Sequence, residues 1–350
     1  MSNINLNRAK TFKNDEFYTQ LADIEKELSH YKEQFNDKIV YCNCDNPEIS
    51  NFWKYFNLNF NDLNLRKLIA TYFDKDKSSL KFEIIRDKDN IKSAPIKTKL
   101  KDNGDFRSPE CIELLKECDI VCTNPPFSLF REYVDLLIKY DKQFLIIGSY
   151  NAVTYKEIFK LIKDNKIWLG YNKCKNFLTN DNNIESINAS WFTNLDIKKC
   201  CKTLELSKSY YTNPDYYPKY DNYEAINVNK IKDIPYDYND VIGVPITFLE
   251  YYNAEQFEII GNVGSYAPNG YSLASAIYIN KKKVFKRIII KRIIIQKIKF
   301  KILGQTGIIE PDGICIKYKG GRPYINDKRM YSRIFIQKRL SLNEPALPLK

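Results

Sequence analysis

Several features that define other protein classes are scarce or missing in this sequence. The 350 residues include a single histidine, His30, and the nine cysteines form no Cys-x-x-Cys pair. A structural zinc site needs clustered Cys and His ligands, so we expect no metal. An odd number of irregularly spaced cysteines does not form a disulfide framework either, which predicts reduced thiols and a cytoplasmic protein.

Long apolar runs and a glycine-rich nucleotide motif are also absent. No run approaches the roughly 18 apolar residues of a membrane-spanning helix, and residues 1–10 are too polar for a signal peptide. We therefore expect no association with a membrane. No Gly-x-Gly-x-x-Gly follows the first predicted strand, so the glycine signature of dinucleotide-binding domains is missing.

Positive charge is in excess. Lys and Arg outnumber Asp and Glu by 55 to 43, which gives a net charge of +12 and a pI near 9.0. Such an excess favours an anionic partner, most often nucleic acid. The alternative is that an AT-rich genome enriched the chain in Lys, Asn, Ile and Tyr without any functional demand.

Apolar runs alternate with amphipathic segments over the first 200 residues. This alternation predicts an α/β fold with a mainly parallel sheet and helices on both of its faces. We expect strands at 38–42, 67–73, 80–86, 120–122, 144–148, 166–170 and 189–193, and helices at 20–35, 50–60, 109–117, 130–140 and 152–163. Ser50 and Ser108 are the expected caps of the second and third of these helices.

The character of the chain changes near residue 200, which suggests one domain over 1–200 and a second over 201–350. Residues 210–240 are crowded with Tyr, Pro and Asn, and order returns over 241–263 and 330–340. The stretch 281–301 combines about ten Lys or Arg with Ile triplets. The strands of this stretch could face DNA phosphates or present an ordinary solvated face. For the second domain as a whole we expect a mixed, β-rich fold.

The central motif is Asn124-Pro125-Pro126-Phe127, directly after the apolar run 120–122. Two consecutive prolines end the strand, and Pro125 restricts Asn124 to extended conformations. The result is a stiff loop at the carboxyl end of a strand, where open α/β sheets bind ligands. The alternative is a proline-stiffened turn with a buried Phe, because Asn-Pro is a common turn former.

The loop has the groups needed to methylate an amino nitrogen. The side-chain oxygen of Asn124 and the carbonyl of Pro125 can accept both hydrogens of an exocyclic amine. The nitrogen lone pair is then directed at an electrophile, while Phe127 offers a face on which a base can stack. Adenine and cytosine both carry such an amine.

Polar residues follow the other predicted strands. The segment Cys42 to Pro47 after the first strand suits a phosphate or nucleoside. Asp74 closes the second strand, where nucleoside-binding sheets place a partner for ribose hydroxyls, although a solvated role fits equally well. Phe17 and Tyr18 precede a helix and suit either a hydrophobic staple or the wall of a ligand pocket.

Taken in order, these blocks resemble the EcoRI-like adenine-specific DNA methyltransferases, a family of amino-directed enzymes that use S-adenosylmethionine. The resemblance covers most of the chain, and the order of the blocks makes it specific. It implies a Rossmann-like class I methyltransferase sheet followed by a target-recognition region. The matching blocks are residues 14–19, 41–47, 124–127, 243–248 and 257–261.

The resemblance implies roles for individual residues. Phe17, Tyr18 and Thr19 line the methionine side of the cofactor. Cys42, Asn43 and Asp45 lie in the loop that replaces the usual glycine-rich motif, with Asp45 near the methionine amino group. Asp74 reaches the ribose and Asp105 the adenine of the cofactor. The catalytic residues are Asn124, Pro125, Pro126 and Phe127.

The expected function is site-specific N6-methylation of a flipped adenine in double-stranded DNA. A cognate restriction endonuclease encoded nearby is the expected partner. One alternative is the same chemistry on cytosine N4, RNA or a protein glutamine. The other is a non-catalytic DNA-binding protein on a methyltransferase scaffold.

Overall fold

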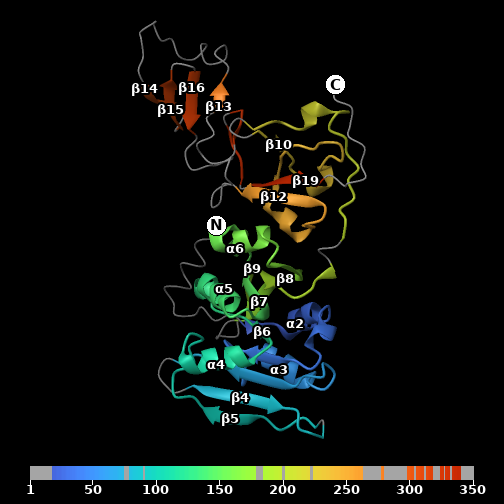
Figure 1. Cartoon of the computed structure of the whole chain (residues 1–350), viewed down its shortest axis with the longest axis vertical. Coiled ribbons are helices and arrows are strands. Elements are labelled where there is room, and N and C mark those ends of the chain that lie inside the picture. Colours follow the sequence, from blue (N-terminus) through green and yellow to red (C-terminus); the bar gives the residue numbers. More distant parts are fainter. Residues whose placement is uncertain are drawn as a thin grey trace. The chain divides into compact units, whose positions relative to one another are not determined.

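The structure is a computed structural model that falls into two compact units, Met1–Lys199 and Cys200–Lys350 (Figure 1). The residues that the structure describes are 18–74, 79–89, 91–178, 184–198, 202–220, 224–262, 277–279, 298–302, 305–310, 313–317, 324–326, 328–331 and 333–339.

A nine-stranded sheet with the order β1-β8-β9-β7-β6-β2-β3-β4-β5 organises the first unit. Most of its strands lie where hydrophobic patterning predicts them, with ends shifted by a few residues. The strands are β1 (Tyr18–Thr19), β2 (Ile39–Cys42), β3 (Lys67–Thr71), β4 (Leu80–Ile85), β5 (Ile96–Lys99), β6 (Ile120–Thr123), β7 (Gln143–Ser149), β8 (Trp168–Leu178) and β9 (Ile184–Thr193).

The sheet is mixed, which corrects the prediction of a mainly parallel sheet. Only the central strands β7, β6, β2 and β3 pair in parallel. The five pairings that flank them are antiparallel. Connection length explains the antiparallel pairs that are consecutive in the chain, because parallel neighbours need a crossover of about a dozen residues or more. Only 72–79 separate β3 from β4, and only 179–183 separate β8 from β9.

Helices cover both faces of the sheet. On one face lie α2 (Leu21–Leu28) and α3 (Asn51–Leu58), and on the other α4 (Pro109–Glu117), α5 (Phe130–Lys139) and α6 (Lys156–Lys163). Capping fixes two helix starts as predicted, because the hydroxyls of Ser50 and Ser108 accept from backbone N–H groups of the first turn. Short 3-10 turns occupy Lys32–Phe35, Phe127–Leu129 and Tyr150–Thr154.

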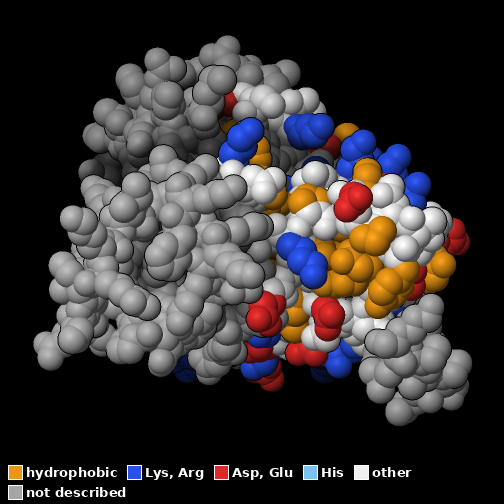
Figure 2. All heavy atoms as spheres, turned by 90° about the horizontal axis from the view of Figure 1, so that it is seen from above, with side chains coloured by type: hydrophobic (Ala, Val, Ile, Leu, Met, Phe, Trp, Pro, Cys, Tyr) orange, Lys and Arg blue, Asp and Glu red, His pale blue; other side chains and the backbone are white. Residues whose placement is uncertain are grey.

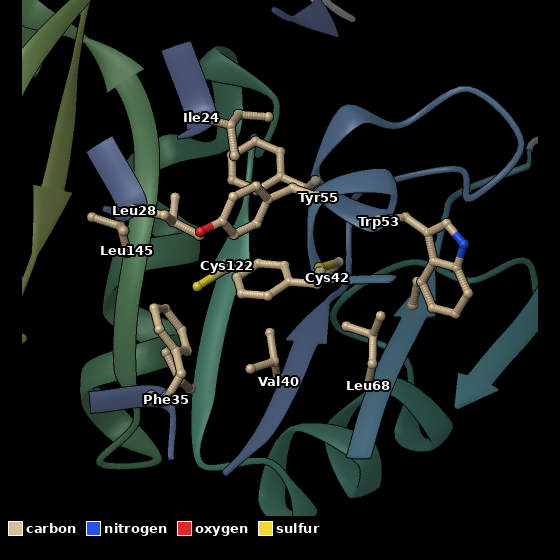
Figure 3. Close-up of a cluster of buried hydrophobic side chains, with 14 of the residues drawn as sticks. Ile24, Leu28, Phe35, Val40, Cys42, Trp53, Tyr55, Leu68, Cys122 and Leu145 are labelled. Carbon is tan, nitrogen blue, oxygen red and sulfur yellow. The ribbon is translucent and has the colours of Figure 1, made fainter. Parts of the chain in front are cut away.

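The hydrophobic core beneath α2 and α3 is built from alternate residues of the parallel strands. Val40 and Cys42 of β2 point into it with Leu68 and Cys122, while Ile24 and Leu28 descend from α2 (Figure 3). The intervening residues point to the opposite face, where Phe130 of α5 packs on Phe192 with ring centroids 4.9 Å apart. Because both faces are covered, these strands appear in the sequence as short continuous apolar runs.

The helix predicted over 20–35 is wrong in its second half. Helix α2 ends at Leu28, and Lys32–Phe35 forms a separate 3-10 turn. The Ser29 hydroxyl donates to the carbonyl of Lys26 at 2.8 Å, a local bond that competes with helix propagation. Tyr31 and Phe35 are nevertheless buried. The apolar spacing therefore predicted the buried residues correctly, although the helix is not continuous.

The second unit is built mainly from short strands in the part of the chain that is described. One sheet has the order β10-β11-β19-β12, another β13-β16-β15-β14, and β17 pairs with β18. Their bounds are β10 (Ile226–Asn227), β11 (Ile242–Pro245), β12 (Phe257–Asn262), β13 (Ile277–Ile279), β14 (Ile298–Ile302), β15 (Gln305–Glu310), β16 (Gly313–Lys317), β17 (Tyr324–Ile325), β18 (Lys328–Arg329) and β19 (Arg333–Lys338); 3-10 turns span Pro214–Tyr216, Ile231–Asp233 and Ile246–Glu250.

The strand predicted near 330–340 is confirmed as β19, in the middle of its sheet. Most of the basic stretch 281–301 lies outside the described residues, and only its last residues fall in β14. Among the helices of the described ranges, none is long and apolar enough to cross a membrane.

A buried carboxylate ties α2 to strand β8. The side chain of Glu27 is inaccessible to solvent and accepts hydrogen bonds from the Tyr31 hydroxyl at 2.9 Å and the Tyr171 N–H at 2.8 Å. The backbone and side-chain N–H groups of Asn172 donate to its other oxygen at 2.8 and 2.9 Å. Four donors converge on one acceptor-only group, which fixes β8 and, through it, its edge partner β1.

We expect Glu27→Gln to lower the free energy of unfolding by ~2 kcal/mol or more, because an amide NH₂ then faces donors and leaves them unsatisfied. Urea unfolding followed by circular dichroism measures the loss. The matched control is Glu25→Gln on the exposed side of the same helix, which should leave stability within about 0.5 kcal/mol of the parent. Equal stability of the two variants would contradict this role for Glu27.

Candidate functional site

The candidate site lies where the central parallel strands end. Strands β2, β3 and β6 run in the same direction, so the residues that follow them emerge at one edge of the sheet. The loop 43–47 follows β2, the loop to Asp74 follows β3, and Asn124 follows β6. Three segments that the sequence marked as candidates therefore share one edge.

Asp45 joins two of these loops. It is 8% exposed, and its Oδ1 accepts from the Ser50 hydroxyl at 2.8 Å. The Thr123 hydroxyl donates to Oδ2, and the backbone N–H of Asn124 also donates to the carboxylate. The carboxylate therefore connects the loop after β2, the start of α3 and the first residue of the Asn-Pro-Pro-Phe loop.

Burial dominates the electrostatics of this carboxylate. Desolvation raises the pKa of Asp45 from 3.8 to about 6, and the hydrogen bonds from Thr123, Ser50 and the Asn124 backbone limit the rise. Burial likewise raises the pKa of the Cys44 thiol well above its usual value, with Asp45 adding to the effect. At neutral pH the loop after β2 thus holds a carboxylate among neutral thiols.

Asn43 and Thr19 place unsatisfied polar atoms in the interior. The Tyr133 hydroxyl of α5 donates to Oδ1 of Asn43, which is 1% exposed. Its Nδ2 and the Oγ1 of Thr19 are both buried, and neither has a hydrogen-bond partner within the described part of the chain. Buried polar atoms are normally paired, so two such atoms mark a place where a polar ligand can bind.

The amino-terminal block reaches the site through β1. Phe17 lies outside the described residues, and of Tyr18 only the backbone is described, paired with Leu178. Thr19 pairs with Phe177 of β8, and its carbonyl accepts from Asn51 Nδ2 at 2.8 Å. Because Asn51 is the first residue of α3, beside Ser50, this bond links the Phe-Tyr-Thr block to the Asp45 loop.

The Asn-Pro-Pro-Phe loop turns away from the sheet as its sequence predicts. Asn124 is half-buried with its side-chain oxygen inside the protein, and Pro125 is buried. Phe127 is 6% exposed and packs edge-to-face against Phe177, with ring centroids 6.2 Å apart. A base could stack on Phe127 only after the surrounding side chains move apart.

Asp74 and Asp105 lie on two loops that are held together. Asp74 N–H donates to the carbonyl of Asn103 at 2.9 Å, and Gly104, at φ +77°, packs directly against the Tyr72 carbonyl, where a Cβ would clash. Asp74 comes three residues after the end of β3, since this strand is shorter than predicted.

The carboxylate of Asp105 is engaged by Arg107. Arg107 donates to it from its backbone N–H at 2.8 Å, from Nε at 2.8 Å and from Nη2 at 2.6 Å. These hydrogen bonds lower the pKa of Asp105. Asp74 and Asp105 therefore lie at the same edge of the sheet as Asp45.

Cys42 contributes little side chain to this edge. It is the last residue of β2, and its thiol is fully buried in the hydrophobic cluster under α2 and α3. Burial raises its pKa well above the usual range. Only its backbone therefore lies beside the loop.

Sequence reasoning missed three residues that organise the site. The sequence predicts Ser50 as a helix cap but not as a donor to Asp45, and it places Thr123 just after a strand predicted over 120–122 without giving it a role. Tyr133 gave no signal beyond its place on the apolar face of α5. For Ser50 and Thr123 a hint existed, because hydroxyl residues beside two candidate loops are potential donors to a buried carboxylate.

We expect Thr123→Val to raise the pKa of Asp45 further, since it removes one donor to the carboxylate with little change of shape. In the native state this pKa is above the unfolded value, so ionisation of Asp45 lowers the free energy of unfolding as pH rises from about 4 to about 6. In the variant this decline should extend above pH 6. Urea unfolding between pH 5 and 8 measures it.

The control is Thr71→Val at the end of β3. The Thr71 hydroxyl bonds to the Tyr41 hydroxyl at 2.7 Å and not to Asp45, so its loss should lower stability equally at every pH in that range. A Thr123→Val profile parallel to that of Thr71→Val would show that the Thr123 hydroxyl does not affect the ionisation of Asp45.

Comparison with known proteins identifies the family. The family described as "Adenine-specific methyltransferase EcoRI" matches residues 5–339. The chain is 51% identical over 286 residues to the Type II methyltransferase M.EcoRI of Escherichia coli, covering 73% of this chain and 88% of that protein. It is 44% identical to M.MgeORF184P of Mycoplasma genitalium and 41% identical to M.MpnI of Mycoplasma pneumoniae. Both comparisons cover 73% of this chain and 84% of the relative.

No solved structure matches this chain. The match of the family model over nearly the whole length nevertheless agrees with the resemblance seen in the ordered sequence blocks. The chain belongs to the EcoRI family of adenine-specific methyltransferases.

Proposed function

We propose that this protein transfers a methyl group from S-adenosylmethionine to N6 of a flipped adenine at a specific site in double-stranded DNA. The observation that carries the proposal is the hydrogen-bonded link from Asp45 through Thr123 to the Asn-Pro-Pro-Phe loop. This link holds a predicted cofactor loop and a predicted amine-binding loop in one fixed arrangement. Family membership supplies the adenine specificity.

The residues at the sheet edge fit this cofactor. Buried Nδ2 of Asn43 is a donor, and buried Oγ1 of Thr19 can donate or accept, so both suit a polar ligand. A carboxylate has about four lone-pair sites, so Asp45 can accept from a ligand ammonium beside its bonds to Ser50 and Thr123. When bound, S-adenosylmethionine supplies a methyl group on a sulfonium, a strong leaving group.

The Asn124 loop would hold the target amine. Its side-chain oxygen and the Pro125 carbonyl accept the two N6 hydrogens, which directs the nitrogen lone pair at the methyl carbon. Both prolines restrict the backbone, and the Asn124 N–H is bound to Asp45, so the acceptors are fixed before the substrate arrives. Such alignment of two reactants supplies a large share of the rate enhancement.

Phe127 would stack on the flipped base. The adenine must leave the duplex because its N6 cannot reach the methyl group while the base is stacked. Since Phe127 is packed on Phe177 here, we propose that entry of the base separates this pair. The energy of stacking an aromatic ring on a base then replaces the contact between the two phenylalanines.

The second unit would recognise the target sequence and hold the DNA backbone. Its described surface exposes tyrosines, including Tyr331 at 86%. Figure 2 shows a face on which hydrophobic side chains gather, with Lys, Arg, Asp and Glu around them. Such surfaces combine flat rings with charges that attract phosphates. In this proposal, residues 1–200 form a Rossmann-like catalytic domain.

A cognate restriction endonuclease would complete the system, since relatives carry the name Type II methyltransferase. DNA from cells that express the protein should then carry N6-methyladenine within one sequence motif. Sequencing of methylated bases identifies that motif. Finding N4-methylcytosine instead would assign the chemistry to the alternative amine.

The Asn124→Ala variant should lose at least ~100-fold in kcat for transfer of labelled methyl groups to duplex DNA, because a positioned polar group of the transition state is removed. Cofactor binding, measured by calorimetry, should change little. The matched control is Asn61→Ala, an exposed asparagine on the loop before β3, which should keep parental activity. Full activity of the Asn124 variant would remove this residue from the mechanism.

A further inference from the structure

The second unit contains a buried arginine whose hydrogen-bond partners among the described residues are neutral groups. Arg333 is the first residue of β19, where it pairs with Pro245 of β11, and it is 7% exposed. Its Nε donates to Oδ1 of Asn227 at 3.1 Å, and its Nη2 donates to Oδ1 of Asn229 at 3.0 Å. Two amide oxygens thus orient the guanidinium.

Further hydrogen bonds make this arrangement rigid. The Tyr220 hydroxyl donates to Oδ1 of Asn227 at 2.6 Å, and Nδ2 of Asn227 donates to Oδ1 of Asn229 at 3.1 Å. Asn227 is itself 2% exposed. The guanidinium is therefore fixed in place before any ligand binds.

No carboxylate within the described ranges forms an ion pair with Arg333; the ion pairs found there all lie in the first unit. Amide oxygens orient a guanidinium but do not neutralise it. Burying a charge is unfavourable unless it is paired. The positive charge of Arg333 is thus available to an external anion.

The guanidinium keeps the donors that an anion needs. Arginine has five N–H groups in a planar fork. The bonds to the two asparagine oxygens use one on Nε and one on Nη2, and a further hydrogen bond joins Arg333 to the Tyr220 side chain. The remaining fork matches the bidentate geometry of a phosphate. Asn229 and its neighbour Lys230 are exposed, so the part of the guanidinium that contacts Asn229 lies close to the protein surface.

We propose that Arg333 binds a backbone phosphate of duplex DNA, an inference that rests on the function proposed above. A side chain that is almost fully buried cannot reach into a groove to read a base edge. It can only meet a group that comes to the protein surface, and phosphates are the outermost groups of the duplex. Arg333 therefore contributes to affinity and to register on the DNA but not to base discrimination.

The test uses Asn229→Asp, which places a carboxylate next to Nη2 and supplies an internal counter-ion. Binding of the full-length variant to a cognate and to a scrambled duplex is measured by fluorescence anisotropy over a series of salt concentrations. We expect the slope of log K against log salt to become shallower by about one, with equal loss of affinity on both duplexes.

Two further variants separate the local effect from net charge and from misfolding. Asn213→Asp changes the net charge equally at another exposed asparagine of the same unit and should leave the slope unchanged. Arg333→Lys keeps the charge and should keep the slope of log K against log salt. Arg333→Gln removes the charge and should make this slope shallower by about one. Thermal unfolding of each variant confirms that the fold is intact.

An Asn229→Asp slope equal to that of Asn213→Asp would overturn the proposal. Loss of affinity for the cognate duplex alone would show instead that Arg333 reads a base, which also overturns it. Failure of the parent protein to bind or methylate any duplex would refute the proposed function itself. The outcomes are therefore distinguishable.

Discussion

The interior of the candidate site depends on one buried carboxylate. Asp45 follows strand β2 at the edge of the sheet. Its two oxygens accept hydrogen bonds from the hydroxyls of Ser50 and Thr123, which lie far apart in the chain. A buried carboxylate is tolerated only when it is well bonded. The loops after β2 and β6 are thereby forced into a single arrangement, and the start of α3 with them.

Antiparallel strands at the flanks complete this arrangement. The long hairpin of β8 and β9 extends the sheet beyond β7 and gives the edge strand β1 a partner. Glu27 fixes β8 to α2. As a result Thr19, from the beginning of the chain, and Phe127, from its middle, both lie against Phe177.

The two units use buried charge in opposite ways. In the first, the carboxylates of Glu27 and Asp45 each accept several hydrogen bonds and act as structural junctions. In the second, Arg333 is oriented by amides that leave its charge unpaired among the described residues. The first arrangement makes a site rigid, and the second prepares a surface for an anion.

The sequence alone determined the features that depend on local physics. Short apolar runs located the strands, Ser50 and Ser108 located two helix starts, and the two prolines after Asn124 determined that the chain turns at the end of β6. The order of the blocks was enough to indicate the family. These features are readable because each is decided within a few residues by backbone geometry or by period.

Only the tertiary structure decided the mixed sheet and the bonding of Asp45 to Thr123. Strand direction at the flanks depends on which edges remain to be paired, and this information is not local. The hydrogen-bond donors to Asp45 and Glu27 include residues 78 and 145 positions away in the chain, and Arg333 donates to a residue 106 positions away. No sequence pattern specifies such pairs, because burial and the need to satisfy polar groups arise only once the elements have packed.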